Sequence, residues 1–344
     1  MGKKILPKMG FLPKISYFAL PFIKRPYILL FNITQKCNLR CSYCFGKYYA
    51  ETGELSFPQI RKILTEFYDL GVRRLGISGG EALLHKDIDR VIEEAVKIGF
   101  DVGLNSNGIL VPYHLKSLRL LKNLSISLDG TTAAIHDKYR GKEAFKRALA
   151  GIEAAYQAGI PLHFCCTLTD ANLKEWPKII NLAKKYNALV QISPLYPRFR
   201  GDGGLKLAKA WEKKIKKTLT DIIQEKKNKS SRIFYSENTY RLMLNWPDFT
   251  SDISSVRELG HPPCLAGNKF VVLDHKGRLF PCVRLTDSLP GQDCLKMGVR
   301  QAYNKLLQPQ CKSCRWACYI EYNALLNFNL SAISNLFLNR FSKG

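Results

Sequence analysis

The chain has 344 residues, of which 46% are hydrophobic and 24% charged, which suffices for one large globular domain or two ordinary ones. Lys and Arg number 53 against 28 Asp and Glu, giving a formal net charge of +25 and a pI near 9.6. This balance favours an anionic partner, although a general solubility or thermal-habitat bias explains it equally well. No stretch of about 20 uninterrupted apolar residues exists, so we expect no transmembrane helix.

Residues 1–26 form a basic arm that also carries aromatic and aliphatic side chains. The arm contains Lys and Arg but no acidic residue. Such a composition suits an anionic membrane surface, whereas Pro7, Pro13 and Pro21 interrupt any long helix. The alternative is an arm that packs on the rest of the protein. We see no cleavage site of a signal peptide after it.

Strand-like and helix-like segments alternate from residue 27 to residue 230. This order is typical of parallel βαβ units, and six units fall short of the eight of a closed barrel. We therefore predict an α/β fold with a parallel sheet and functional groups at the carboxyl ends of its strands. The expected strands are 28–34, 73–78, 101–105, 123–128, 161–168 and 189–194, and the expected helices are 57–70, 86–98, 112–121, 142–158, 172–187 and about 205–227.

Three cysteines follow the first expected strand. Cys37, Cys41 and Cys44 have the spacing C-x3-C-x2-C. Cuboidal iron–sulfur clusters are usually held by four thiolates, so three close thiolates can hold three irons and leave the fourth open to a small chelating molecule. Zinc is the alternative, but zinc motifs usually add a second pair of Cys or His residues, and no nearby pair completes this one.

This motif resembles the signature of the radical S-adenosylmethionine (radical SAM) enzymes, C-x3-C-x-aromatic-C, with Tyr43 at the aromatic position. The resemblance implies a partial (β/α)6 TIM-like barrel, which agrees with the count of six units. It also implies a [4Fe–4S] cluster on Cys37, Cys41 and Cys44, with SAM bound to the open iron through its amino and carboxylate groups. Electron transfer would cleave SAM to methionine and a 5′-deoxyadenosyl radical, which abstracts hydrogen from the substrate. No catalytic residue beyond the cluster is assignable from the sequence.

The second expected strand ends in Gly79, Gly80 and Glu81. Two glycines allow a backbone to approach a ligand closely, and a G-G-E at this position of the family contacts the amino group of SAM. A strand-to-helix turn is the alternative explanation for the glycines. The family usually has proline next, where this chain has Ala82.

Three more polar residues are assigned to SAM through the resemblance. Ser127 and Asp129 alternate along the fourth strand, so both point the same way, and they could bind the ribose or carboxylate of SAM. Arg140 lies in a stretch similar to the H-D-x-x-R-G of family members that have a C-terminal auxiliary domain. It is the expected partner of the SAM carboxylate, with a surface salt bridge as the alternative.

A second group of cysteines follows residue 260. We expect a hairpin between Lys269–Leu273 and Arg278–Phe280, and cysteines flank it. Such a hairpin, followed by a C-x2-C pair, can gather four thiolates around one metal centre, which is either a cluster or zinc. The cysteines of this region are Cys264, Cys282, Cys294, Cys311, Cys314 and Cys318.

Their pattern resembles the SPASM/twitch auxiliary domain of radical SAM enzymes over residues 255–318. The resemblance implies an auxiliary [4Fe–4S] cluster on Cys264, Cys282, Cys311 and Cys314, as in the shorter twitch version. The pattern departs from a full SPASM domain because no cysteine follows Cys318. Cys318 is therefore a tentative further ligand and Cys294 a possible one.

We predict five parts of the chain: the arm 1–26, the barrel 27–230, a linker 231–260, the auxiliary cluster domain 261–318 and an apolar tail 319–344. Residues 322–338 carry no charge, and Leu326, Leu330, Ile333 and Phe337 recur at helical spacing. The tail is expected to be a helix that caps the barrel or the auxiliary domain. The other interpretation is a lipid-facing element.

The predicted function is a radical SAM enzyme that abstracts hydrogen from a peptide or protein substrate for oxidative modification or cross-linking, and the basic charge favours an anionic one. A lipid or isoprenoid substrate at the membrane surface is the alternative. A different class, a non-enzymatic iron–sulfur or zinc protein, is disfavoured, and no signature of nucleic-acid binding supports it. The cysteine spacings favour the cytoplasm, with peripheral membrane contact as an option. The expected protein partner is an electron donor such as ferredoxin or flavodoxin.

Overall fold

The computed structural model describes the chain except for residues 1–23, 45–52, 197–208, 229–230 and 342–344. The arm predicted for residues 1–26 therefore lies almost entirely outside the described residues. In the part of the chain that is described, no helix has both the length and the hydropathy needed to cross a bilayer. No disulfide joins any of the cysteines, all of which lie among the described residues.

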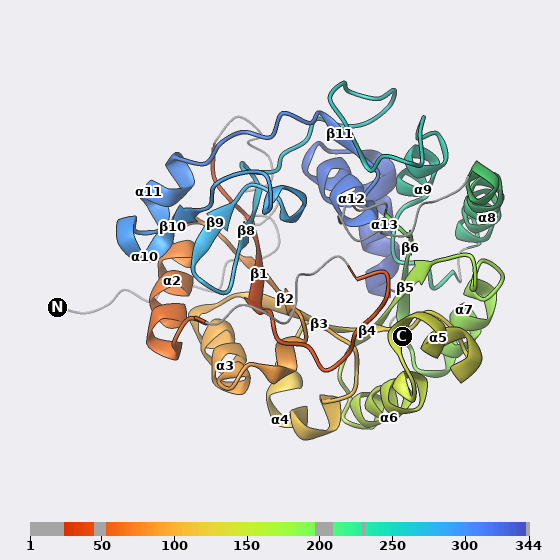
Figure 1. Ribbon diagram of the computed structural model, residues 1–344, viewed down its shortest axis with the longest axis horizontal. Helices are drawn as coiled ribbons and strands as arrows, with labels where there is room; N and C mark the ends of the chain where they lie inside the picture. Colours follow the sequence, from red (N-terminus) through yellow and green to blue (C-terminus); the bar gives the residue numbers. More distant parts are fainter. Residues whose placement is uncertain (1–23, 45–52, 197–208, 229–230, 342–344) are drawn as a thin grey trace.

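Six parallel strands form the predicted barrel wall, and each pairs with the next along the chain: β1 (Ile28–Thr34), β2 (Arg74–Gly79), β3 (Asp101–Ser106), β4 (Asn123–Ser127), β5 (Leu162–Leu168) and β6 (Leu189–Pro194). Helices cover the outer face of the sheet (Figure 1). They are α2 (Phe57–Leu70), α3 (Ile88–Ile98), α4 (Leu115–Leu118), α5 (Ala133–Arg140), α6 (Ala144–Gln157), α7 (Trp176–Lys185) and α8 (Lys209–Lys226). The predicted α/β fold with a parallel, partial-barrel sheet is confirmed.

The helices form because their apolar residues recur on one face and their ends are capped. In α2, Ser56 and Gln59 form a capping box, and Gly71 ends the helix with φ 120°. The expected helix 112–121 is wrong in extent. It consists of a 3-10 turn, η2 (Val111–Tyr113), and the four-residue α4, because His114 between them leaves the helical region with φ −123°.

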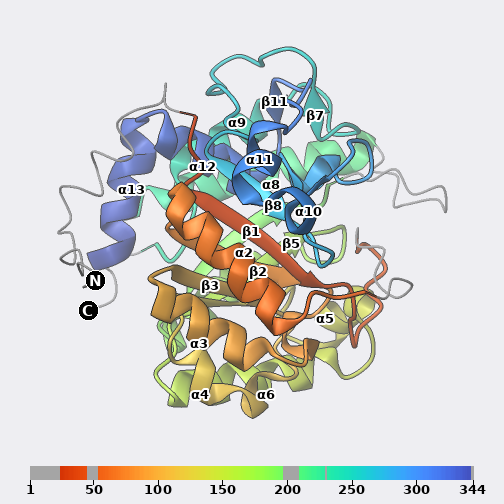
Figure 2. The ribbon, with the colours of Figure 1, turned by 90° about the vertical axis from the view of Figure 1, so that its left-hand side faces the viewer.

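The cysteine-rich region extends the barrel sheet beyond β1, which the sequence did not predict. Strands β8 (Phe270–Leu273), β9 (Arg278–Phe280) and β10 (Gln292–Asp293) continue it in the order β10-β9-β8-β1. β8 runs parallel to β1, and β8 and β9 form the predicted hairpin. The open edge at β1 is thereby covered (Figure 2).

The segment expected to be a linker is folded. It contains α9 (Glu237–Leu244), which packs on α8 and on α12 (Ala317–Leu326), and β7 (Ile253–Ser254), which pairs with β11 (Ser313–Cys314). Trp246 and Phe249 of this segment are buried in the core. Three short helical elements complete the region: η3 (Val283–Leu285), α10 (Cys294–Met297) and α11 (Val299–Asn304).

The single helix expected for the tail is two helices, α12 and α13 (Leu330–Phe341). Phe328, with φ 61°, breaks the helix between them. α12 is packed into the protein and is not an exposed tail. The carboxylate of its residue Glu321 is 4% exposed and accepts hydrogen bonds from the hydroxyls of Ser236 and Thr239 at 2.7 and 2.6 Å.

Candidate functional site

The glycines after β2 lie against the chain that leads from β1 to the cysteines. A Cβ atom on Gly80 would lie 2.2 Å from the carbonyl oxygen of Lys36, and one on Gly79 would lie 2.3 Å from that of Thr34. The backbone N–H of Gly80 donates to the carbonyl of Thr34 at 2.9 Å, and that of Glu81 donates to the carbonyl of Lys36 at 2.7 Å. The glycines are therefore required for a backbone contact that positions the start of the Cys37 loop.

The carboxylate of Glu81 is 1% exposed and bonded to the protein backbone. Its two oxygens accept hydrogen bonds from the N–H of Leu83 at 3.1 Å and of Asn107 at 2.7 Å. Burial raises the pKa of this carboxyl, although the backbone hydrogen bonds oppose the shift. Glu81 thus joins the carboxyl ends of β2 and β3. Its side chain, which the sequence assigned to SAM, already has partners.

Cys37, Cys41 and Cys44 lie half-buried on the loop after β1. The N–H of Cys44 donates to the carbonyl of Cys41 at 3.0 Å, and the N–H of Ser42 donates to the carbonyl of Tyr139 in α5 at 2.9 Å. Burial raises the pKa of the Cys41 thiol to about 11, and Arg140 opposes this shift. Iron binding would therefore release protons from these thiols.

Tyr43, Asp129 and Arg140 form one buried network. The Asp129 carboxylate accepts hydrogen bonds from Arg140 Nε at 2.6 Å, from the Tyr43 hydroxyl at 2.5 Å and from the N–H of Thr167 at 2.9 Å. Asp129 is 3% and Arg140 8% exposed. Burial acts to raise the pKa of Asp129, but Arg140 and the hydrogen bonds hold it below its usual value. The three predicted residues thus contact one another.

The remaining predicted SAM contact, Ser127, is half-buried at the end of β4. Two contacts at these strand ends were not predicted. The side-chain amide of Asn107 donates to Asn38 Oδ1 at 2.7 Å, which ties the Cys37 loop to the end of β3. The Asp137 carboxylate accepts from the N–H of Phe145 at 2.7 Å, at the start of α6. The sequence places Asn107 directly after a strand, where functional groups are expected. Nothing in the sequence indicated that Asn38 would be its partner.

His136 makes the free energy of unfolding depend on pH. Its Nδ1 accepts a hydrogen bond from the N–H of Asp129 at 3.2 Å, and burial followed by Arg140 lowers its pKa to about 4. Below pH 6.5 the unfolded chain binds a proton that the folded chain does not, so stability falls as pH decreases from 6.5 towards 4. Between pH 6.5 and 5.5 we expect a loss of about 1 kcal/mol in the free energy of unfolding.

The variant His136→Gln keeps a hydrogen-bond acceptor but does not titrate. Urea unfolding under anaerobic conditions at pH 5.5, 6.5 and 7.5 should therefore give a flatter pH dependence for the variant than for the parent chain. The two slopes should agree above pH 7. Equal slopes below pH 6.5 would contradict the assignment.

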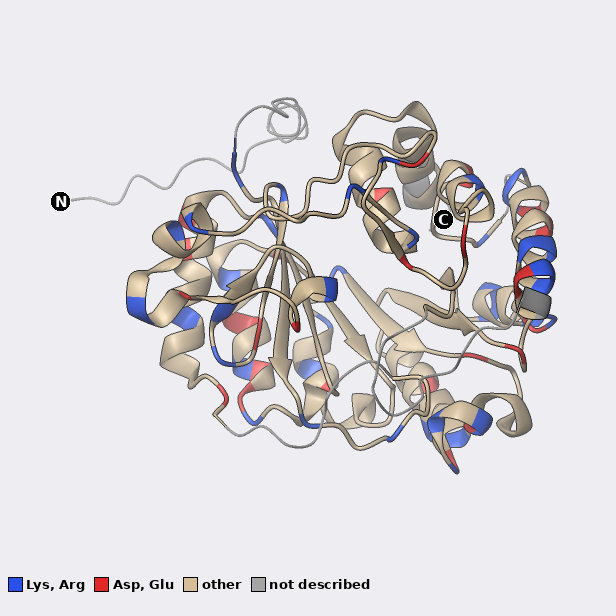
Figure 3. Cartoon of the chain, turned by 45° about the horizontal axis from the view of Figure 1, so that its top comes forward, with Lys and Arg blue, Asp and Glu red and all other residues tan. Residues whose placement is uncertain are grey.

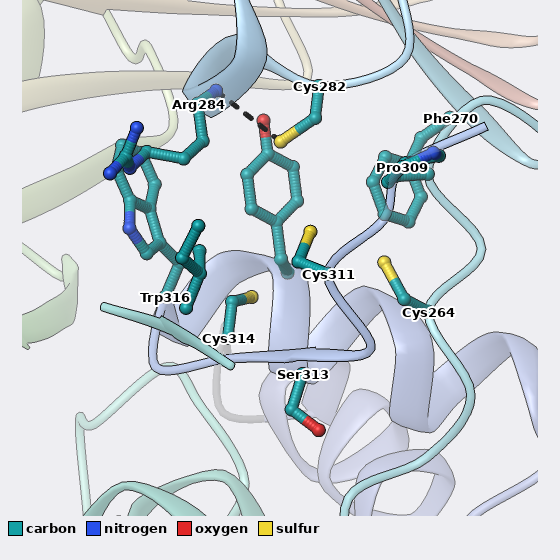
Figure 4. A pocket seen from close by; sticks show the side chains of 12 residues that line it. Cys264, Phe270, Cys282, Arg284, Pro309, Cys311, Ser313, Cys314 and Trp316 are labelled. Atoms are coloured by element: carbon teal, nitrogen blue, oxygen red, sulfur yellow. Dashed lines mark hydrogen bonds between the residues drawn. The ribbon is translucent and has the colours of Figure 1, made fainter. Parts of the chain in front are cut away.

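The four cysteines predicted for an auxiliary cluster lie around one cavity (Figure 4). Cys264 precedes β8, Cys282 follows β9, and Cys311 and Cys314 lie at or beside β11. Phe270, Trp316 and Tyr319 also line it, as does the charged side chain of Arg284. Tyr319 stacks on Phe270 with ring centroids 5.1 Å apart, and Trp316 stacks on Tyr196 at 4.7 Å. Four thiols and three aromatic rings therefore make up more than half of the lining residues.

The other two cysteines do not line this cavity. Cys294 begins α10, is 1% exposed and has Asp293, Glu66 and Asp274 as its charged neighbours. Cys318 lies in the first turn of α12. It influences the pKa of Cys165 in β5, which burial raises to about 12 and on which Arg140 also acts. Arg140 and Cys318 are thus both near enough to Cys165 to act on its pKa.

The donor sets suit iron–sulfur clusters, because both groups consist of thiols alone. Among the residues that the structure describes, no group of three or more His, Cys, Asp or Glu side chains is arranged to hold a single metal ion. The four thiols of the auxiliary region nevertheless surround a common cavity.

The comparisons with known proteins agree with this geometry. The family described as "Radical SAM superfamily" matches residues 31–183, which contain all three cysteines of the first loop. An AdoMet-dependent heme synthase of Methanosarcina barkeri is 30% identical over 268 residues, 75% of this chain and 76% of that protein. A probable GTP 3′,8-cyclase of Methanococcus maripaludis is 28% identical over 305 residues, 82% of this chain and 95% of the relative.

Solved structures share the fold. SuiB of Streptococcus suis, bound to S-adenosylmethionine, has a TM-score of 0.64 at 15% identity and covers 85% of this chain and 68% of its own. Native anSMEcpe with bound AdoMet has a TM-score of 0.62 at 18% identity and covers 81% of this chain and 80% of its own.

A partial parallel barrel with a three-cysteine loop after its first strand defines an enzyme that uses SAM and an iron–sulfur cluster. The chain belongs to the radical SAM superfamily, and its C-terminal region is rich in cysteine. Radical SAM enzymes use a [4Fe–4S] cluster with SAM, and this chain has the cysteines for an auxiliary cluster as well. The predicted enzyme class and cofactors are confirmed.

Proposed function

We propose that this enzyme abstracts a hydrogen atom from a peptide or protein substrate, which leads to an oxidative modification or a cross-link. When bound, the first cluster supplies the electron that cleaves SAM to methionine and a 5′-deoxyadenosyl radical. Cys37, Cys41 and Cys44 hold that cluster, and the other residues position the loop and SAM around it.

The observation that carries the proposal is the partial exposure of the inner face of β5 and β6. Cys165 and Gln191, side by side on these strands, are half-buried, whereas Phe164 and Val190 on the helix-covered face are fully buried. Cys165 pairs with Ser127 of β4 in the sheet, and Arg140 and Cys318 both act on the pKa of Cys165. This face is the place that we propose for the substrate. SuiB, which has this fold, has been solved with the precursor peptide SuiA.

The residues that the sequence assigned to SAM fall into two groups in this proposal: some contact SAM and others position the cysteine loop. Gly79 and Gly80 offer backbone groups next to the cysteine loop, and Ser127 offers a hydroxyl. Asp129 and Arg140 act through Tyr43 by fixing the loop, and Glu81 acts through the backbone of Asn107. Asp129, Arg140 and Glu81 are thus positioning residues. The auxiliary cluster is assigned to Cys264, Cys282, Cys311 and Cys314, because these four surround one cavity.

A lipid or isoprenoid substrate is the second candidate, and one observation favours it. On and next to α13, Leu330 is 82%, Leu338 54%, Phe328 42% and Leu336 40% exposed. No acidic residue lies between Glu321 and Phe341 in the sequence. An exposed apolar surface of this kind suits peripheral contact with a membrane.

Deuterium transfer distinguishes the two substrates. The reconstituted, reduced enzyme is incubated anaerobically with SAM and either the peptide or the lipid fraction of deuterated host cells, and 5′-deoxyadenosine is analysed by mass spectrometry. We expect deuterium from the peptide fraction and none when Cys37, Cys41 and Cys44 are replaced by Ala. Deuterium from the lipid fraction alone, together with flotation on anionic liposomes, would overturn the peptide proposal.

A further inference from the structure

A second depression, with a volume of about 560 Å³, adjoins the auxiliary cavity on the outside of the molecule. Cys264, Ala266, Pro309 and Cys311 line both the cavity and this groove. Cys264 and Cys311 are half-buried, whereas Cys282 is buried. Two of the proposed cluster ligands thus form the wall between the auxiliary site and the groove.

The rim of the groove is basic and apolar. Arg257 and Lys312 line it and are exposed. In the loop that carries Arg257, Leu259 is 96% and Val256 61% exposed, and Leu307, next to the lining residue Gln308, is 48% exposed. A patch of exposed apolar residues with charges around it is typical of a protein interaction surface.

Acidic residues are scarce at this rim. Glu258 is the one acidic residue in segments 253–268 and 305–314. Its carboxylate accepts a hydrogen bond from the Ser254 hydroxyl at 2.6 Å. The rim thus presents a positive charge to a partner.

The groove does not suit the substrate of the barrel. Each of its lining residues comes from the cysteine-rich region, between Arg257 and Lys312, and none from β1–β6. A molecule bound there contacts ligands of the auxiliary cluster but not the inner face that carries Cys165. An electron-transfer partner needs to contact the cluster, but it does not need to reach the site of hydrogen abstraction.

We propose that the surface formed by Val256, Arg257, Leu259, Leu307 and Lys312 binds an acidic one-electron carrier protein, which exchanges electrons with the auxiliary cluster at Cys264 and Cys311. This inference rests on the auxiliary cluster of the proposed function, but not on the identity of the substrate. In the step, one electron leaves the reduced auxiliary cluster and reduces the oxidised carrier by one electron, with no proton transferred.

The test uses the full chain with Cys37, Cys41 and Cys44 replaced by Ala, so that it carries the auxiliary cluster alone. The protein is photoreduced anaerobically and mixed with an oxidised acidic [2Fe–2S] ferredoxin or with an acidic flavodoxin. Stopped-flow absorbance gives the rate of carrier reduction, and calorimetry gives the dissociation constant. The variant R257E/K312E should reduce affinity and second-order rate at least about 10-fold at low salt and less at high salt, because charge reversal removes electrostatic steering.

The matched control is K122E/K217E, which makes the same charge change at Lys residues 69% and 79% exposed on the barrel. The control is needed because Lys and Arg lie on most helices (Figure 3). It should change affinity less than twofold. Equal weakening by both variants, no weakening by R257E/K312E, or tight binding of an acidic synthetic peptide but of neither carrier would overturn the proposal. None of these readouts depends on SAM cleavage, so failure of the peptide-substrate proposal would leave them unchanged.

Discussion

Asp129→Asn should lower the free energy of unfolding by about 3–5 kcal/mol, because it leaves the buried guanidinium of Arg140 without its charged partner. The carboxylate accepts hydrogen bonds from Arg140, Tyr43 and the backbone of Thr167. The amide keeps the shape of the side chain but loses the charge. SAM cleavage should also fall, since Tyr43 lies between Cys41 and Cys44 and is fixed by this carboxylate.

The control is Asp221→Asn, which removes a charge from an exposed i,i+4 pair with Lys217 and should cost less than about 0.5 kcal/mol. The double variant Asp129→Leu/Arg140→Met should regain part of the stability, because it leaves no unpaired charge, but not the rate of 5′-deoxyadenosine formation.

Because the pKa of Asp129 is held below its usual value, the stability that ionisation provides is lost only as pH falls through that low pKa. The difference between parent and Asp129→Asn should then stay constant from pH 6 to 8. A change below about 0.5 kcal/mol would refute the role of the network.

The sequence predicted the barrel because its signals are local. Apolar periodicity marked each strand and helix, and parallel strands bring their carboxyl ends to one edge. Cys37, Gly80 and Asp129 could therefore be placed at the same edge before their contacts were known. The hairpin of β8 and β9 was also predictable, since Asp274 and Gly277 form its turn locally.

Contacts between distant segments left no such signal. The parallel pairing of β8 with β1 joins residues far apart in the chain, Ile28 with Phe270, and either strand could have paired elsewhere. The buried position of Glu81 depends on the N–H of Asn107, and a backbone donor cannot be read from a residue type. The apolar tail likewise gave no signal for the break at Phe328, where φ is 61°, or for the hydrogen bond that Glu321 of α12 accepts from Ser236.

Gly80→Ala is expected to have the second large effect, because its new methyl group meets backbone and not a flexible side chain. The Cβ atom would lie 2.2 Å from the carbonyl oxygen of Lys36 and 2.7 Å from that of Gln35. The chain leading to Cys37 must then move away from β2. Overpacking of this kind costs roughly 1–3 kcal/mol, and misplacement by about 1 Å can reduce a rate about 100-fold. We therefore expect SAM cleavage to fall by at least about 100-fold.

Gly159→Ala separates this steric effect from the ordinary cost of replacing glycine. Gly159 has φ +70° with nothing within 4 Å of an added Cβ, so the variant should lose about 1–2 kcal/mol for the left-handed backbone and retain SAM cleavage. Bound iron separates the two sites: Gly80→Ala should lose the SAM cluster and keep the auxiliary one, with about half the iron of the parent. Full iron content and normal SAM cleavage in Gly80→Ala would show that the backbone contact with Lys36 does not position the cysteine loop. Loss of both clusters would instead mean that this contact supports the whole sheet, since β1 carries the first cysteine loop at its end and pairs with β8 of the auxiliary region along its edge.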